Sequence, residues 1–431
     1  MKRIFHVILV LSVFLVAACG NNTPSNSESS SNSNNKTENQ GEEKEKIELL
    51  FWTPEVGAKK EAIQSSVDTF NASQNEIVVK AEHMDGESLK TKMKVSMASN
   101  QMPDIFHYWS GDSFKLFVDA NVVADLTDHI NKDESFKNSL MPGALDRSSY
   151  DGKVYGLPNA INNVILWYNK DIFAQYNLQP PTTMEELEAV VKVLKENDVT
   201  PISLAGKRRW PVLHWFSYLS NRIGGNEPFQ KAIAGEGDFT QESFIQAGAK
   251  LQELVQNGSF TNGFLGVDNE AAEAEFTSGK SGMYLMGDWS LGNLKKNSNF
   301  EVGYTMFPVI DGGAGEPNHV HGGFGTGYAV SNTADLDAAY KFLAFLLGTE
   351  ERTKFIETMG EPSPVKTNPS EDKLDPVSYS YLKFAGSTPT GYFPFYDQAL
   401  GPKKAELLLN AVSAIAGDPS LDVKAELSKV K

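Results

Sequence analysis

The sequence predicts an α/β protein with two large domains, each built on a mostly parallel sheet flanked by helices. The chain has 431 residues, which at about 100 to 200 residues per domain leaves room for two cores. Apolar runs of strand length alternate with stretches in which apolar residues recur at helical spacing. An alternation of this kind builds a parallel sheet with helices on both faces.

The N-terminal residues have the pattern of an export signal. Lys2 and Arg3 precede an apolar stretch, 4–18, that is short for a membrane-spanning helix but suits the apolar region of a secretory signal. The stretch ends in Ala17-Ala18-Cys19, which resembles the bacterial lipobox, where the signal is cut before the Cys and the thiol is lipidated. We therefore expect residues 1–18 to be a signal peptide and Cys19 to anchor the protein to the outer face of the cell membrane. An ordinary secretory signal with a chance Cys is the alternative.

Residues 20–46 contain no large apolar side chain, and seven Asn and six Ser lie among them. Such a segment cannot bury a core. We expect residues 19–46 to form a disordered tether, which as a flexible coil would span about 30 Å root-mean-square.

The next part of the chain reads as βαβαβ. Strands are expected at 47–52, 77–81 and 103–109, and stripes of apolar residues at helical spacing lie between them, over 62–70 and 89–97. Ligands of such folds collect beyond the carboxyl ends of the strands.

The second half repeats the alternation with different connections. Thr183-Met184-Glu185-Glu186 is a capping box that opens a helix. The other expected elements are strands at 164–168, 283–286 and 328–330, helices around 251–255 and 338–346, and two helical stretches on either side of Gly417-Asp418-Pro419.

The composition excludes several classes of function. The chain carries 55 acidic and 39 basic side chains, a formal charge of −16. An acidic excess of this size argues against a nucleic-acid partner, because phosphate neutralisation needs clustered Lys and Arg. A single Cys excludes intramolecular disulfides and thiolate metal clusters.

An ordered set of short motifs resembles one known family. The motifs are Phe51-Trp52, Phe70-Asn71, Met102-Pro103-Asp104-Ile105, Gly156-Leu157-Pro158, Tyr168-Asn169-Lys170-Asp171-Ile172-Phe173, Phe276 with Gly279 and Met283, Gly287-Asp288-Trp289, and Gly322-Gly323. Over residues 46–431 this order resembles the family 1 extracellular solute-binding proteins of bacterial ABC sugar importers, in their lipoprotein form. The start of the chain, through Asp119-Ala120, also resembles binders of α-galactosyl oligosaccharides of the raffinose type.

The resemblance implies a type II-like periplasmic-binding-protein fold, with two α/β lobes joined by crossing segments and a ligand cleft between them. Crossings are expected near 158–162, 304–308 and 358–363, where Gly and Pro punctuate the pattern. The expected N-lobe is 47–160 plus 306–358, and the expected C-lobe is 161–305 plus 359–431.

The resemblance also implies a function. A monomeric binding protein without cofactor or catalysis would capture an oligosaccharide, such as an α-galactoside, between the lobes, close on it and deliver it to the transmembrane subunits of an ABC permease.

Sugar rings stack their C–H faces on aromatic side chains and present hydroxyls to carboxylates and amides. Trp289, with Asp288 beside it, is therefore the first stacking candidate, although it could be a core Trp beneath a turn. The stretch 391–397 is a second aromatic platform or a loop sealed by its own rings. The predicted ligand-binding set is Trp52, Glu55, Lys60 (or Lys59), Trp109, Ser110, Asn163, Trp210, Asp288, Trp289, Phe324, Phe395 and Asp397.

Other chemistries remain as alternatives. A surface glycoside hydrolase would need two carboxylates about 5 to 9.5 Å apart across the cleft, and 55 acidic residues leave that open. The same fold could bind a polyamine or a metal ion, and a scaffold or adhesin would bind no small molecule. His319 and His321 are expected in a solvated loop rather than at a metal, and Gly323-Phe324-Gly325 is not a nucleotide loop because a strand follows it.

Overall fold

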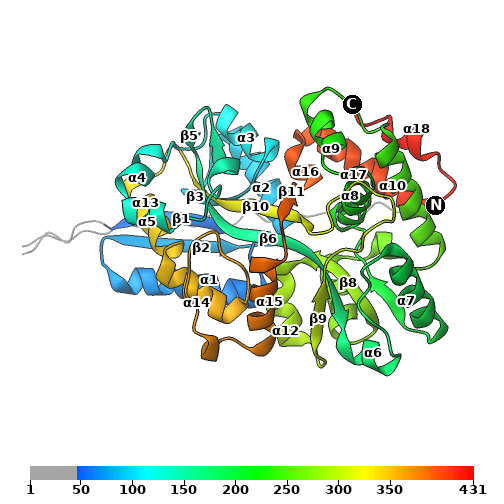
Figure 1. Cartoon of the computed structure of the whole chain (residues 1–431). Coiled ribbons are helices and arrows are strands. Elements are labelled where there is room, and N and C mark those ends of the chain that lie inside the picture. The colour runs from blue at the N-terminus through cyan, green and yellow to red at the C-terminus, as the bar shows by residue number, and fades with distance from the viewer. Residues whose placement is uncertain (1–45) are drawn as a thin grey trace, which may run out of the picture. The chain divides into compact units, whose positions relative to one another are not determined.

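One mixed β-sheet runs through residues 46–431, the part of the chain that the computed structural model describes (Figure 1). The predicted signal peptide, Cys19 and all but the last residue of the predicted tether lie outside this part. The strand order is β2 (Ile77–His83), β1 (Ile47–Thr53), β3 (Ile105–Trp109), β10 (His319–Val330), β6 (Gly156–Asn169), β8 (Ser281–Gly287) and β7 (Thr200–Ser203), with β9 (Val302–Thr305) paired to β6 and β11 (Gly391–Phe393) to β10. β4 (Ser149–Tyr150) and β5 (Lys153–Val154) form a separate hairpin.

Two long strands, β6 and β10, join the two halves of the molecule. The first half of β6 pairs with β10, and its second half pairs with β8 and β9. β10 in turn pairs with β3 through its last residues. The two strands approach so closely that a Cβ at Gly322 would lie 1.9 Å from the Asn162 carbonyl oxygen, and one at Gly327 would lie 2.2 Å from the Leu157 carbonyl oxygen. Only glycine fits at such positions.

The N-lobe is parallel over β2-β1-β3, as predicted, and antiparallel where β10 joins it. Its core packs Phe51 against Tyr328 and Phe342 at ring distances of 5.0 and 5.6 Å. Its helices are α1 (Gly57–Ser73), α2 (Gly86–Ser99), α3 (Asp112–Asp119), α4 (Thr127–Lys132), α5 (Glu134–Ser139), α13 (Leu336–Leu346) and α14 (Thr349–Met359), with the 3-10 turn η1 (Asp146–Ser148). The 3-10 turn η4 (Glu371–Lys373) lies in the last connection between the lobes.

The C-lobe is built around β6, β8, β7 and β9. The predicted capping box opens α7 (Met184–Glu196), where Thr183 and Glu186 cap each other's backbone N–H. The remaining elements of this lobe are α6 (Lys170–Gln175), α8 (Trp210–Gly224), α9 (Glu227–Ala234), α10 (Glu242–Gln256), η2 (Phe264–Gly266), α11 (Asn269–Thr277), η3 (Asp288–Ser290), α12 (Leu291–Asn297), α15 (Pro376–Ser387), α16 (Tyr396–Ala399), α17 (Pro402–Gly417) and α18 (Val423–Leu427). The alternation of strands and helices expected from the sequence is confirmed. The predicted mostly parallel sheet is wrong for this lobe, because β6 pairs antiparallel with both β8 and β9 and only β7 and β8 pair in parallel.

The lobe boundaries differ from those expected. Residues 306–318 belong to the C-lobe, because the buried Arg222 guanidinium donates to the Phe307 carbonyl at 3.2 Å and to the Glu316 carbonyl at 3.0 Å. The second crossing is therefore in β10, at 322–326, and not at 304–308. Gly and Pro mark turns in the sequence, and a turn need not coincide with a change of lobe.

The third crossing also lies later than 358–363. Met141 N–H donates to the Pro364 carbonyl at 2.8 Å, and Lys366 N–H donates to the Ser139 carbonyl at 2.7 Å, so this segment still packs on the N-lobe. The chain joins the C-lobe at α15. In the structure the N-lobe comprises 47–159 and 326–366, and the C-lobe comprises 164–321 and 376–431.

A buried carboxylate ties three elements of the C-lobe together. Asp288, only 1% exposed, accepts hydrogen bonds from the Asn163 backbone N–H at 3.0 Å, the Asn163 amide at 2.7 Å and the Tyr381 hydroxyl at 2.9 Å. These contacts join β6, η3 and α15. Asp288 and Asn163 were predicted to bind ligand, but their polar groups are directed at each other inside the lobe. Burial raises the pKa of Asp288 to about 7.

Replacing this carboxylate tests its structural role. In Asp288→Asn an amide N–H₂ faces groups that are themselves donors, so we expect the free energy of unfolding at pH 5 to fall by about 1 to 3 kcal/mol. Folding raises the pKa of Asp288 from 3.8 to about 7, so its contribution to stability is complete below pH 4 and is lost as the pH rises to 7. The stability difference between wild type and variant, measured by urea unfolding across this range, should therefore shrink with rising pH.

A difference that grows with pH would contradict this interpretation. It would mean that the three donors keep Asp288 ionised in the folded protein, and that the charged form is the stabilising one.

Candidate functional site

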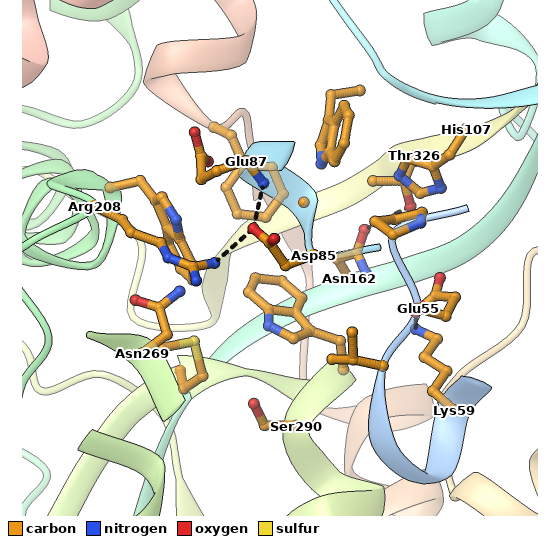
Figure 2. A pocket seen from close by; sticks show the side chains of 18 of the residues that line it. Glu55, Lys59, Asp85, Glu87, His107, Asn162, Arg208, Asn269, Ser290 and Thr326 are labelled. Carbon is orange, nitrogen blue, oxygen red and sulfur yellow. Dashed lines mark hydrogen bonds and ion pairs between the residues drawn. The ribbon is translucent and has the colours of Figure 1, made fainter. Parts of the chain in front are cut away.

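A cavity of about 280 Å³ lies between the lobes, next to the crossing strands (Figure 2). The N-lobe contributes the loop from β1 into α1, the start of α2 and the end of β3. The C-lobe contributes the start of α8, α11, η3 and the segment around α16, and the crossing strands contribute Asn159, Asn162 and Thr326. A molecule in this cavity would touch both lobes at once.

Aromatic side chains form much of the C-lobe wall. Trp210 begins α8, and its ring centroid lies 6.2 Å from that of Trp289 in η3. Phe395 lies 6.1 Å from Trp289 on another side. Trp109, at the end of β3, faces the cavity from the N-lobe, and the Lys90 ammonium lies 5.0 Å from its ring centroid. The cavity therefore offers flat apolar faces from both lobes.

A buried charge cluster forms the N-lobe side. Lys59 Nζ lies 2.8 Å from the Glu361 carboxylate and 3.7 Å from that of Glu55. Burial alone would lower the pKa of Lys59, but the charges of Glu361 and Glu55 raise it above its ordinary value. Burial raises the pKa of Glu55. The result is a fixed cation beside a carboxylate that can accept a hydrogen bond from a ligand.

The lysine in this cluster is Lys59, and the predicted Lys60 is exposed on the outer face of α1. Consecutive helical residues point about 100° apart, so only one of the two can face the cavity. Because α1 begins at Gly57, Lys59 is the one that faces the cavity.

Neutral polar groups complete the cavity. Thr326 Oγ1 donates to Asn159 Oδ1 at 2.8 Å and to Asn162 Oδ1 at 3.2 Å. Burial lowers the pKa of both His107 and His214 to about 3, so these imidazoles are neutral at physiological pH. Within residues 46–431 neither ring nitrogen of His107 has a hydrogen-bond partner. A neutral imidazole both donates and accepts, which suits hydroxyl groups.

Carboxylates from the C-lobe also reach the cavity. Glu273 of α11 and Asp397 of α16 line it, and burial raises the pKa of each. Glu270 also lines the cavity and pairs with Arg208.

Six of the twelve predicted ligand-binding residues line this cavity: Glu55, Trp109, Trp210, Trp289, Phe395 and Asp397. Their roles toward a ligand remain predictions.

The other six predicted residues do not line the cavity. Asn163 and Asp288 bond to each other inside the C-lobe, and Lys60 is exposed on α1. Trp52 is 5% exposed and packs in the N-lobe core beneath the Lys92 ammonium, which lies 3.8 Å from its ring centroid. Ser110 is buried, with its N–H bonded to the Gly325 carbonyl at 2.9 Å. Phe324 packs half-buried against the N-lobe core.

Several lining residues were missed. His107 could have been found, because it lies two positions before Trp109 in a predicted strand and so shares its face. Asp85, Arg208 and Asn269 gave no sequence signal, since each lies at the edge of a helix in a different part of the chain.

The stretch 391–397 is largely sealed against the C-lobe by its own rings, and its role as a sugar platform stays a prediction. It forms β11 and the start of α16, and the rings of Phe393 and Tyr396 are buried in the C-lobe, whereas Phe395 borders the cavity. The expectation of a solvated loop is wrong for His321, which lies in β10, is 1% exposed and stacks on Phe393 at 4.9 Å.

A second cavity of about 170 Å³ lies beside the first, between α2 and α3 of the N-lobe and α17 of the C-lobe. Both cavities are lined by Lys90, Trp109, Arg208, Trp210 and Asp397. The two cavities are therefore direct neighbours.

Known proteins resemble this chain along most of its length. An uncharacterised ABC transporter extracellular-binding protein of Pyrococcus horikoshii is 27% identical over 398 residues, covering 90% of this chain and 84% of that protein. The multiple sugar-binding protein of Streptococcus mutans is 25% identical over 384 residues, covering 86% and 84%. A structure solved in work on xylan utilisation by the thermophilic bacterium Caldanaerobius polysaccharolyticus is 28% identical, with a TM-score of 0.84, covering 89% of this chain and 99% of that one.

In the described part of the chain, no helix has the length and apolar character needed to cross a membrane. Residues 65–376 match the sequence pattern of one family throughout. The two-lobe fold and its central cavity agree with that match, and the chain belongs to the bacterial extracellular solute-binding proteins.

Proposed function

We propose that this protein captures an oligosaccharide between its lobes and delivers it to the transmembrane subunits of an ABC permease. The observation that carries the proposal is the cavity itself, in which aromatic faces and hydrogen-bonding groups of both lobes converge. The protein acts as a carrier and leaves its ligand uncut.

The chemistry of the lining suits a neutral sugar. Trp289 and Trp210 offer faces for the C–H side of a ring, and Glu55, Asn162 and His107 offer acceptors and donors for hydroxyls. The relatives named above support this class, since one is a multiple sugar-binding protein and one comes from work on xylan utilisation.

The presence of two neighbouring cavities favours an oligosaccharide over a monosaccharide. Trp109 and Trp210 line both cavities, so a chain of rings could pass from one cavity to the other along these side chains. An α-galactoside of the raffinose type, which the N-terminal sequence suggests, is one ligand to test.

Delivery requires that the ligand changes the balance between open and closed forms. A ligand shifts this equilibrium only by its difference in affinity for the two forms. Because the cavity walls come from both lobes, a bound oligosaccharide would make more contacts when the lobes are closed.

We further propose that the protein acts as a monomer on the outer face of the cell membrane, anchored through Cys19. The sequence Leu15-Val16-Ala17-Ala18-Cys19 supports this anchor.

The function can be tested by thermal unfolding of residues 46–431 with a panel of mono- and oligosaccharides, polyamines and metal salts. A ligand at 100 times its Kd should stabilise the folded form by about 2.7 kcal/mol and raise the unfolding midpoint. We expect at least one oligosaccharide to do so and to be recovered intact by product analysis.

A cleaved sugar would make the cavity an active site. A response to polyamines or metal salts alone would change the ligand class, and no response to any compound would contradict the proposal.

The stacking role can be tested with Trp289→Ala. Loss of the ring should weaken oligosaccharide binding by about 1 to 3 kcal/mol, or about 5- to 150-fold, in isothermal titration calorimetry. Trp289→Phe keeps an aromatic face and should lose less. The unfolding midpoint without ligand controls for folding, and unchanged affinity in a folded Ala variant would remove Trp289 from the site.

A further inference from the structure

One ion pair connects the lobes across the cavity. Asp85, in the loop between β2 and α2, belongs to the N-lobe, and Arg208, in the loop between β7 and α8, belongs to the C-lobe. Arg208 Nη1 lies 3.4 Å from Asp85 Oδ1, and both side chains line the cavity (Figure 2).

The arginine is held in place by its own lobe. Arg208 Nε lies 2.7 Å from Asp268 Oδ1, and Nη2 lies 3.2 Å from Glu270 Oε1. These two contacts fix the plane of the guanidinium and leave Nη1 directed at the N-lobe. A preorganised donor of this kind loses little conformational freedom when it meets its partner.

The aspartate is fixed as well. Asp85 is the N-cap of α2, and its Oδ1 accepts hydrogen bonds from the backbone N–H groups of Glu87 at 3.1 Å and Ser88 at 3.2 Å. Partial burial would raise the pKa of Asp85, but hydrogen bonds from Ser88 and the charge of Arg208 lower it below its ordinary value. Asp85 is therefore ionised at neutral pH.

Another ion pair between the lobes is more exposed to solvent and therefore weaker. Lys296 and Glu61 lie 3.5 Å apart, but their side chains are 56% and 73% exposed, compared with 20% and 33% for Arg208 and Asp85. Water screens the exposed pair more strongly.

We propose that the Arg208–Asp85 pair is a latch that stabilises the closed form and thereby sets the affinity and the release rate of the ligand. An interaction made only when the lobes are closed adds its free energy to that of ligand binding. The effect on ligand affinity and release (the affinity part) rests on the proposed function. The effect on the balance between open and closed lobes (the closure part) does not.

A double-mutant cycle tests the affinity part. Asp85→Asn keeps the helix cap, because Asn caps as well as Asp, and Arg208→Gln removes the charge on the other side. Each single variant should bind the oligosaccharide about 2- to 5-fold more weakly, mainly through faster dissociation. The double variant should be no weaker than the weaker single variant, because both changes remove the same interaction.

Lys207→Gln is the matched control. Lys207 lies in the same loop and pairs with Asp268 of its own lobe at 2.9 Å, so its loss should change affinity less than 2-fold. A loss in Arg208→Gln without a loss in Asp85→Asn would mean that Arg208 contacts the ligand itself. That result, additive losses, or unchanged affinity in both single variants would overturn the latch.

The closure part can be measured without a ligand. Residues 46–431 contain no Cys, so spin labels at Val95→Cys on α2 and Lys192→Cys on α7 report only the distance between the lobes. These side chains are exposed. Asp85→Asn and Arg208→Gln should shift the distance distribution away from the closed form, and Lys207→Gln should not.

An unchanged distribution in both latch variants would overturn the proposal. If no sugar binds at all, the proposed function fails, but the label distances still decide whether the ion pair holds the lobes together.

Discussion

The close pairing of β6 with β10 is the constraint on which the rest of the molecule depends. Both strands belong to both lobes, and together with the third connection, between residue 366 and α15, they limit how the lobes can move relative to each other. Glycines at 322 and 327 permit this pairing, because a Cβ at either position would collide with the backbone of β6. The cavity lies where these strands cross, and its polar floor comes from their own side chains.

The two sides of the cavity differ in what holds them rigid. On the N-lobe side, Lys59 is fixed between two carboxylates, so it supplies a positive charge without flexibility. On the C-lobe side, Asp288 fixes η3 from behind, and the aromatic side chain that follows it in the sequence lies at the cavity. A site preorganised in this way spends little of its binding energy on ordering itself.

The sequence predicted the parts of this structure that depend on local pattern. Periodicity predicts strands that end at or just before Trp109 and Trp289, and the capping box predicts the helix after Thr183. All three features are present in the structure. Whether Lys59 or Lys60 faces the cavity depends on the exact start of α1, and the burial of Asp288 depends on Tyr381, 93 positions away. The lobe to which residues 306–318 belong depends on their contacts with Arg222 of α8. Such long-range contacts leave no periodic pattern in the sequence.

In the proposed function, one ligand bridges the two lobes. A crystal structure of residues 46–431 with the oligosaccharide that gives the largest rise in unfolding midpoint tests it most directly. We expect a sugar ring on Trp289 or Trp210 of the C-lobe, with hydroxyls bonded to at least one of Glu55, Lys59 and His107 of the N-lobe. A sugar that contacts only one lobe, or that lies outside the cavity, would contradict it.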